Sequence, residues 1–247
     1  MYTNEKDKDN LVILEHPGYM TYSKHILSFF KELHLPNKLP HGVNVMNPYQ
    51  NEIVFSLCEK FYKKYYDNNK PRKILLGINP GRFGAGITGI PFTDPVKLEE
   101  ECNIKNDLPK KRELSADFIY QMIKTFGGKE NFYNQFYFGS VSPLGFTKDG
   151  KNLNYYDDQK LQKAILPFIL DTIQAQIEFG IDTDVAYCLG EGKNFKFLSQ
   201  LNHDHGFFKR IIPLSHPRFI MQYRRKKMHL FMDDYLKKLI DPESIQP

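Results

Sequence analysis

Four short runs of apolar residues constrain the fold of this chain more than any other feature of its sequence. They are residues 74–78 (ILLGI), 136–141 (FYFGSV), 185–189 (VAYCL) and 211–214 (IIPL). Runs that are apolar without alternation are typical of strands buried on both faces of a parallel sheet. The sequence therefore predicts four such strands.

Helical patterns separate and follow these runs. Apolar residues recur every three or four positions over 165–177 and 228–239, and two further helices are expected at 23–33 and 52–65. Strands that alternate with helices pack as layers, with helices on both faces of the sheet. We therefore expect an α/β fold: a three-layer α/β/α sandwich around a four-stranded, mainly parallel central sheet.

The length of the chain fits one domain. Its 247 residues, of which 41% are hydrophobic, can bury one substantial core without disulfides or metals. We expect a disordered N-terminus at 1–10, a single domain at 11–240 and a flexible tail at 241–247. Residues 1–10 are polar, and no apolar run reaches the length of a membrane span. These features predict an intracellular monomer without membrane contact, in the cytoplasm or nucleoid if the source is bacterial.

The residues that commonly bind metals do not form a recognisable site. Cys58, Cys102 and Cys188 are widely spaced, include no CxxC pair, and are fewer than the four ligands of an iron–sulfur cluster. Residues 203–205 (HDH) supply two imidazoles without further ligands and are expected to form a polar loop. The sequence predicts reduced cysteines, no metal and no cofactor.

Polar and glycine-rich segments follow each of the four apolar runs. They are residues 77–84 (GINPGRFG), 140–146 (SVSPLGF), 190–193 (GEGK) and 215–218 (SHPR). Ligands of open α/β sheets bind at the carboxyl ends of the strands, where such loops converge. We therefore expect these four segments to form one site.

The longest of these segments, residues 77–92 (GINPGRFGAGITGIPF), is the most informative. Its five glycines let the backbone approach a ligand closely, and Pro80 and Pro91 stiffen the loop around Asn79. Taken alone, the segment could be an ordinary strand-to-helix turn or a loop that binds phosphate. The GEGK segment lacks the first glycine and the following Ser or Thr of a P-loop.

The early part of this segment, GINPG, resembles the mismatch-specific uracil and thymine glycosylases. The whole span is more similar to the single-strand-selective monofunctional uracil-DNA glycosylases, whose pattern runs from G-M-N-P-G-x-F-G to T-G-x-P-F. Downstream, residues 215–227 (SHPRFIMQYRRKK) resemble the second motif of the uracil-DNA glycosylase superfamily. The resemblance implies a DNA glycosylase of this superfamily, acting in base excision repair.

The resemblance also implies roles for individual residues. Asn79 would position the attacking water and contact the base, and His216 would donate a hydrogen bond to the carbonyl oxygen of the leaving base. Phe92 would form the aromatic floor of the base pocket. The expected base-binding residues are Gly77, Ile78, Gly81, Phe83, Phe92 and Ser140. Neither motif contains a lysine at its core, so the sequence predicts a monofunctional enzyme without a lyase step.

The DNA-binding surface is expected at the second motif. Arg218, Phe219 and Ile220, after Pro217, would form the wedge that replaces a flipped-out base in single- or double-stranded DNA. Arg224, Arg225 and Lys226 would contact phosphates, because a last helix that begins near Gln222 would place residues 224–227 in its first turns, where an anion is favoured. Residues 70–73 and 110–112 are also basic, and we expect them to be solvated.

One position departs from the family pattern. Ser140 stands where an asparagine reads the edge of uracil, and a hydroxyl replaces an amide that can donate and accept at once. This change leaves open whether the base is uracil, hypoxanthine, xanthine or an oxidised pyrimidine. Two other functions also remain open: a DNA-damage binding module with little catalysis, and an α/β enzyme that binds a nucleotide or another small molecule.

Overall fold

The four predicted strands form one parallel sheet in the computed structural model, which describes residues 20–35 and 38–244. The strands are β2 (Arg72–Gly77), β3 (Phe136–Ser140), β6 (Ile181–Leu189) and β7 (Arg210–Leu214), in the order β3-β2-β6-β7. The register pairs Gly77 with Ser140 and Leu189 with Leu214, so the loops after the four strands leave from one edge. The predicted fold class is confirmed.

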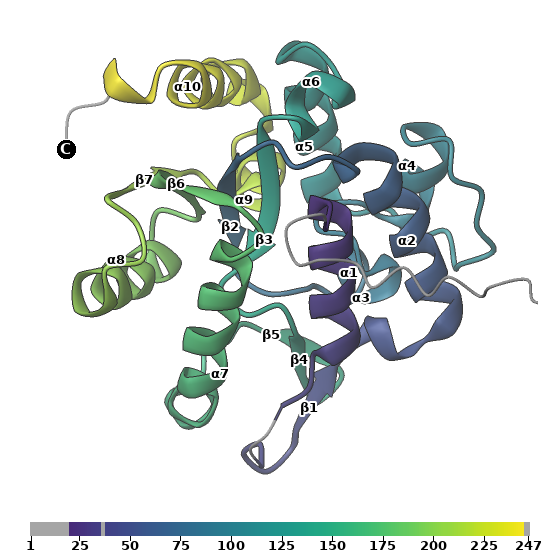
Figure 1. Ribbon diagram of the computed structural model, residues 1–247. Helices are drawn as coiled ribbons and strands as arrows, with labels where there is room; N and C mark the ends of the chain where they lie inside the picture. Colours follow the sequence, from purple (N-terminus) through teal and green to yellow (C-terminus); the bar gives the residue numbers. More distant parts are fainter. Residues whose placement is uncertain (1–19, 36–37, 245–247) are drawn as a thin grey trace, which may run out of the picture.

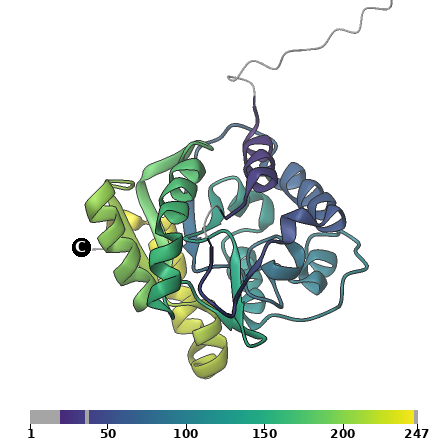
Figure 2. The ribbon, with the colours of Figure 1, turned by 90° about the horizontal axis from the view of Figure 1, so that it is seen from below.

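Helices cover both faces of this sheet. The chain crosses from β2 to β3 in one direction and from β3 through β6 to β7 in the other. Right-handed crossovers therefore place α5 (Leu114–Thr125) on one face, and α7 (Gln159–Ile177) and α8 (Lys193–His205) on the other. The last helices, α9 (Pro217–Tyr223) and α10 (Met228–Ile240), pack against α5. Figures 1 and 2 show α7 next to α8, with α1 (Tyr22–Glu32) and α2 (Glu52–Tyr66) on the other side of α7 from α8.

The remaining elements lie around this sandwich. The helices α1 and α2 pack together beside the edge strand β3, where the ring of Tyr22 contacts that of Tyr137. Side chains of Asn51, Asp94 and Asp158 accept backbone N–H groups and so fix the starts of α2, α4 (Pro95–Glu100) and α7. These elements are α1 (Tyr22–Glu32), η2 (Pro48–Gln50), α2 (Glu52–Tyr66), α3 (Ala85–Thr88), α4 (Pro95–Glu100), α6 (Lys129–Tyr133), η3 (Arg225–Lys227) and η4 (Pro242–Ser244).

A second, antiparallel sheet was not predicted. It consists of β1 (Val43–Met46), β4 (Gly145–Lys148) and β5 (Lys151–Leu153), in the order β1-β4-β5. Asp149 and Gly150 join β4 to β5 with positive φ angles of 50° and 69°, as in a tight hairpin turn. The Asp-Gly dipeptide could therefore have predicted a β-hairpin from the sequence. The strands of three or four residues are too short to show the alternation of apolar and polar residues that marks a strand. This hairpin carries the chain back toward the carboxyl edge of the central sheet.

The expectation of a solvated basic run at residues 70–73 is wrong for Arg72. Its guanidinium is buried beside the rings of Tyr22 and Tyr66, at 4.5 and 4.9 Å from their centroids. It donates to the carbonyls of Tyr133 and Lys70 and to the side chain of Asn68. A buried arginine is tolerated here because its donors are paired and aromatic faces attract the cation.

The C-terminal part of the chain also differs from expectation. The last helix begins at Met228, not near Gln222, because α9 ends at Tyr223 and residues 225–227 form the separate turn η3. Arg224 therefore lies at the C-terminal end of α9, where a cation is favourable. Lys227 is the N-cap of α10, so the helix-dipole argument for a bound anion applies at the start of that helix and not at Arg224. Within the expected flexible tail, Pro242–Ser244 form the 3-10 turn η4, and residues 203–205 form the last turn of α8, not a loop. The tail beyond Ser244 and the expected disordered segment 1–10 lie outside the described residues.

Cys58, Cys102 and Cys188 are buried and free. Among the residues that the structure describes, no helix is long and apolar enough to cross a membrane.

Candidate active site

A cavity of about 870 Å³ opens at the carboxyl edge of the central sheet. It is lined by residues at the carboxyl ends of all four strands or in the loops after them, by β5 and the segment that follows it, and by the start of α5. Ten of the residues expected from the sequence line it: Gly77, Ile78, Asn79, Gly81, Phe83, Phe92, Ser140, His216, Arg218 and Phe219. The structure thus brings the two motifs together, while the roles of these residues remain predictions.

Asn79 is held by the backbone of the segment that follows β5. Its Nδ2 donates to the carbonyl of Leu153 at 3.3 Å, and its Oδ1 accepts from the N–H of Tyr155 at 3.1 Å. The hydroxyl of Tyr155 in turn donates to Oδ1 of the buried Asn194 at 2.7 Å. A carboxamide oxygen has two lone pairs, so Oδ1 of Asn79 keeps one acceptor position for a group in the cavity.

His216 is the residue that caps α9. Its Nδ1 accepts from the N–H of Arg218 at 3.1 Å, which leaves the proton of the neutral ring on Nε2. Burial, together with the positive charge of Arg218, lowers the pKa of His216 from 6.5 to about 4. The imidazole is therefore neutral at physiological pH, with one N–H free to donate.

Phe92 adopts a backbone conformation that is rare for a bulky residue, with φ at 54°. Strain of this kind costs about 1–3 kcal/mol and is found mostly where function requires a particular geometry. The end of its ring lies 3.5 Å from the position that a Cβ at Gly77 would occupy. Its centroid is 5.3 Å from that of Phe138 and 6.3 Å from that of His216. The ring is thus held between the end of β2 and the imidazole.

Ser140 ends the edge strand β3, and its backbone is fixed by a side chain. Gln176 of α7 accepts from the N–H of Ser140 at 3.3 Å and donates to its carbonyl at 3.1 Å. These are the bonds that a further strand would supply. The same amide lies where a Cβ of Gly139 would stand, so glycine at 139 makes the contact possible.

The expected wedge is only partly exposed. Ile220 is fully buried and Pro217 is buried, so assigning Ile220 to a surface that enters DNA is wrong. Phe219 is 39% exposed, Tyr223 one turn later is 61% exposed, and their ring centroids are 5.9 Å apart. Arg224 lies over the ring of Phe219. Because α9 begins at Pro217, its helical phase turns residues 220 and 221 into the core and residues 219 and 223 outward.

Other groups of the cavity were not found from the sequence. They come from β5 and the segment after it, which include Asn152, Asn154 and Asp157, and from Glu113 before α5. The Asp-Gly turn before β5 is the one sequence signal near these residues, and none of them belongs to either motif. Within residues 20–35 and 38–244, no group of three or more His, Cys, Asp or Glu is placed to hold a metal ion.

The chain matches known proteins in both sequence and structure. The model of the uracil DNA glycosylase superfamily matches residues 63–240. The chain is also similar to the crystal structure of SMUG2 from Pedobacter heparinus, with 46% sequence identity and a TM-score of 0.89. The match covers 92% of this chain and 100% of that one. The chain therefore belongs to the uracil DNA glycosylase superfamily and is similar to its SMUG branch.

Proposed function

We propose that this chain is a monofunctional DNA glycosylase that flips uracil or a related damaged base out of DNA and hydrolyses its N-glycosidic bond. Membership of the superfamily supports a DNA glycosylase. The observation that carries the finer proposal is the convergence of Asn79, Phe92 and His216 on one cavity. Its volume lies within the range of ligand pockets, about 300–1,000 Å³, so it can accept an extruded nucleobase.

His216 assists departure of the base. When the bond between C1′ of the sugar and the base breaks, negative charge accumulates on a carbonyl oxygen of the base. The neutral imidazole can donate its Nε2–H to that oxygen, and burial prevents the ring from taking up a second proton. A donor directed at developing charge is typically worth ~3 kcal/mol, or about a hundredfold in rate.

Asn79 orients the water that attacks C1′. The free lone pair of its Oδ1 accepts one O–H of the water, while the backbone of Leu153 and Tyr155 keeps the carboxamide in place. Because the amide is fixed before substrate binds, little reorganisation is needed at the moment of reaction.

Aromatic rings support the flipped state. Phe92 stacks on the extruded base, and such stacking is worth about 1–3 kcal/mol. Phe219 occupies the space that the base leaves in the strand. The exposed cations Arg218, Arg224, Arg225 and Lys226 contact the phosphates.

Ser140 sets the selectivity for the base. Gln176 fixes the backbone of Ser140, so this residue cannot easily move toward the base. Its side chain is a small hydroxyl, where the family pattern has the longer amide of an asparagine. The extra room favours bases other than uracil as additional substrates: hypoxanthine, xanthine or an oxidised pyrimidine.

The product is an intact strand with an abasic site. The lysines of the cavity, Lys151 and Lys193, are exposed, and Lys193 lies 3.9 Å from Asp157. A Schiff-base lyase needs a lysine with a lowered pKa, which burial usually provides.

The test is incubation with oligonucleotides that each carry one uracil, hypoxanthine, xanthine or oxidised pyrimidine, followed by alkali. We expect cleavage only after alkali, and losses of about a hundredfold or more in the single-turnover rate of His216→Ala and of Asn79→Ala, each with an unchanged fold. Wild-type rates in both variants would contradict the site. Lesion binding without cleavage would identify a damage-binding module instead.

A further inference from the structure

Glu113 directs its carboxylate into the cavity although it belongs to neither motif. It is the residue before α5, and its side chain does not cap that helix. Its Oε2 fills the place that a Cβ of Gly84 would occupy, and its Oε1 lies 3.7 Å from the corresponding position at Gly81. The carboxylate therefore lies against the glycine-rich loop that follows Asn79.

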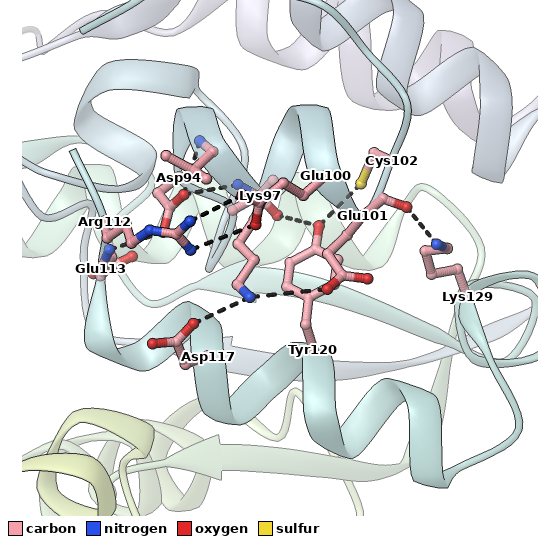
Figure 3. Close-up of polar contacts among 12 residues, drawn as sticks. Asp94, Lys97, Glu100, Glu101, Cys102, Arg112, Glu113, Asp117, Tyr120 and Lys129 are labelled. Atoms are coloured by element: carbon pink, nitrogen blue, oxygen red, sulfur yellow. Dashed lines mark hydrogen bonds and ion pairs between the residues drawn. The ribbon is translucent and has the colours of Figure 1, made fainter. Parts of the chain in front are cut away.

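The backbone of Glu113 is fixed from the other side. Its N–H donates to Oδ2 of Asp94 at 2.8 Å, while Oδ1 of Asp94 caps α4 (Figure 3). The start of α5 is thus tied to the start of α4, and Glu113 is held at the wall of the cavity.

Of the three acidic side chains that line the cavity, Glu113 is the one left without a partner. Glu191 accepts from the hydroxyl of Ser215 at 2.6 Å. Asp157 accepts from the N–H of Asn154 at 3.1 Å and lies near Lys193. Among the described residues, none donates a hydrogen bond to the carboxylate of Glu113 or forms an ion pair with it within 4.0 Å. A carboxylate held against the loop of Asn79 without a structural partner is available to a ligand.

We propose, on the basis of the glycosylase function above, that Glu113 is a second catalytic group: its ionised carboxylate accepts a proton from the water that Asn79 orients. In this step the water oxygen bonds to C1′ as the bond from C1′ to the base nitrogen breaks. The electron pair of that bond leaves with the base, and one water proton moves to Glu113. The same negative charge stabilises the positive charge that develops on the sugar. Glu113 then loses the proton to solvent or to the departing base anion.

The charges around Glu113 suit this role. Burial and the negative charge of Asp94 raise its pKa to about 7, while Arg218 of α9 acts in the opposite direction. His216, which also lines the cavity, is neutral and adds no charge. A base with a pKa near the working pH combines a useful ionised fraction with adequate basicity. The rate should therefore rise with pH through about 7 and then level off.

The test measures single-turnover rates between about pH 5.5 and 9 on the best substrate of the lesion panel. We expect Glu113→Gln to lose about 100-fold at about pH 8, to lose much less at about pH 6, and to lack the rise near pH 7. Affinity for an oligonucleotide with an uncleavable 2′-fluorinated lesion should change little. Glu100→Gln, which removes an exposed carboxylate on the neighbouring α4, is the matched control and should behave as wild type.

A second variant provides a positive signal. Glu113→Ala opens space beside the loop of Asn79, and added formate should restore part of its rate because a free carboxylate can take over as base. A Glu113→Gln variant that keeps both the wild-type rate and the wild-type pH profile would overturn the role of Glu113 and leave the glycosylase function intact. A wild-type protein that cleaves no lesion of the panel would overturn both.

Discussion

The raised pKa of Glu113 predicts that its neutral replacement stabilises the protein, and does so more at high pH. The folded protein favours the protonated acid, because its pKa is about 7 instead of the ordinary 4.5. The unfolded chain releases that proton near its ordinary pKa. Stability therefore falls as pH rises from about 4.5 to about 7, since over this interval the folded state binds more protons than the unfolded state. Glu113→Gln keeps the size of the side chain and removes the titration.

The size of the effect follows from the same two values. A change in pKa from 4.5 to about 7 corresponds to at most ~3 kcal/mol of lost stability at about pH 8. The carboxylate opens onto a cavity that solvent can enter, and screening reduces this figure. We expect Glu113→Gln to raise the free energy of unfolding, relative to wild type, by about 1–2 kcal/mol more at about pH 8 than at about pH 5.

Urea unfolding followed by circular dichroism at the two pH values measures this difference directly. Comparing each variant with wild type at the same pH cancels the titration of all other groups. Ser115→Ala is the control, because Ser115 also lines the cavity but does not titrate in this range. A Glu113→Gln difference that is equal at both pH values, or larger at about pH 5, would refute the argument from burial. A stabilised variant that has lost activity would be typical of a residue kept for function.

Three further predictions follow from the site. Nuclear magnetic resonance of the His216 ring should detect no titration above about pH 5, and an inflection near 6.5 would contradict a buried neutral imidazole. Phe219→Ala should reduce flipping of a fluorescent base analogue without loss of stability, whereas Ile220→Ala should cost about 2–5 kcal/mol in urea unfolding because Ile220 is buried; the reverse pattern would return Ile220 to the DNA surface. Ser140→Asn should narrow the range of excised lesions toward uracil, and an unchanged range would show that Ser140 does not set selectivity.

The sequence determined the central sheet and the two motif loops. A continuous apolar run is a local property of the chain. A strand that is buried on both faces has such a run wherever it lies in the sheet. Once the four strands were recognised as parallel, their carboxyl ends had to share an edge. For that reason Asn79, Phe92 and His216, although far apart in sequence, could be expected in one cavity.

Only the tertiary structure decided which groups surround those three residues. Asn79 is held by residues 153–155, and Glu113 reaches the cavity from the start of α5; neither contact leaves a local pattern, because each depends on how distant segments pack. The exposure of Phe219 and the burial of Ile220 depend on how α9 is rotated against the core. Neighbouring residues of a helix point in different directions, so the sequence alone could not tell which of the two is exposed. Patterns along the chain thus fixed the scaffold, whereas contacts across it decided which polar groups face the substrate.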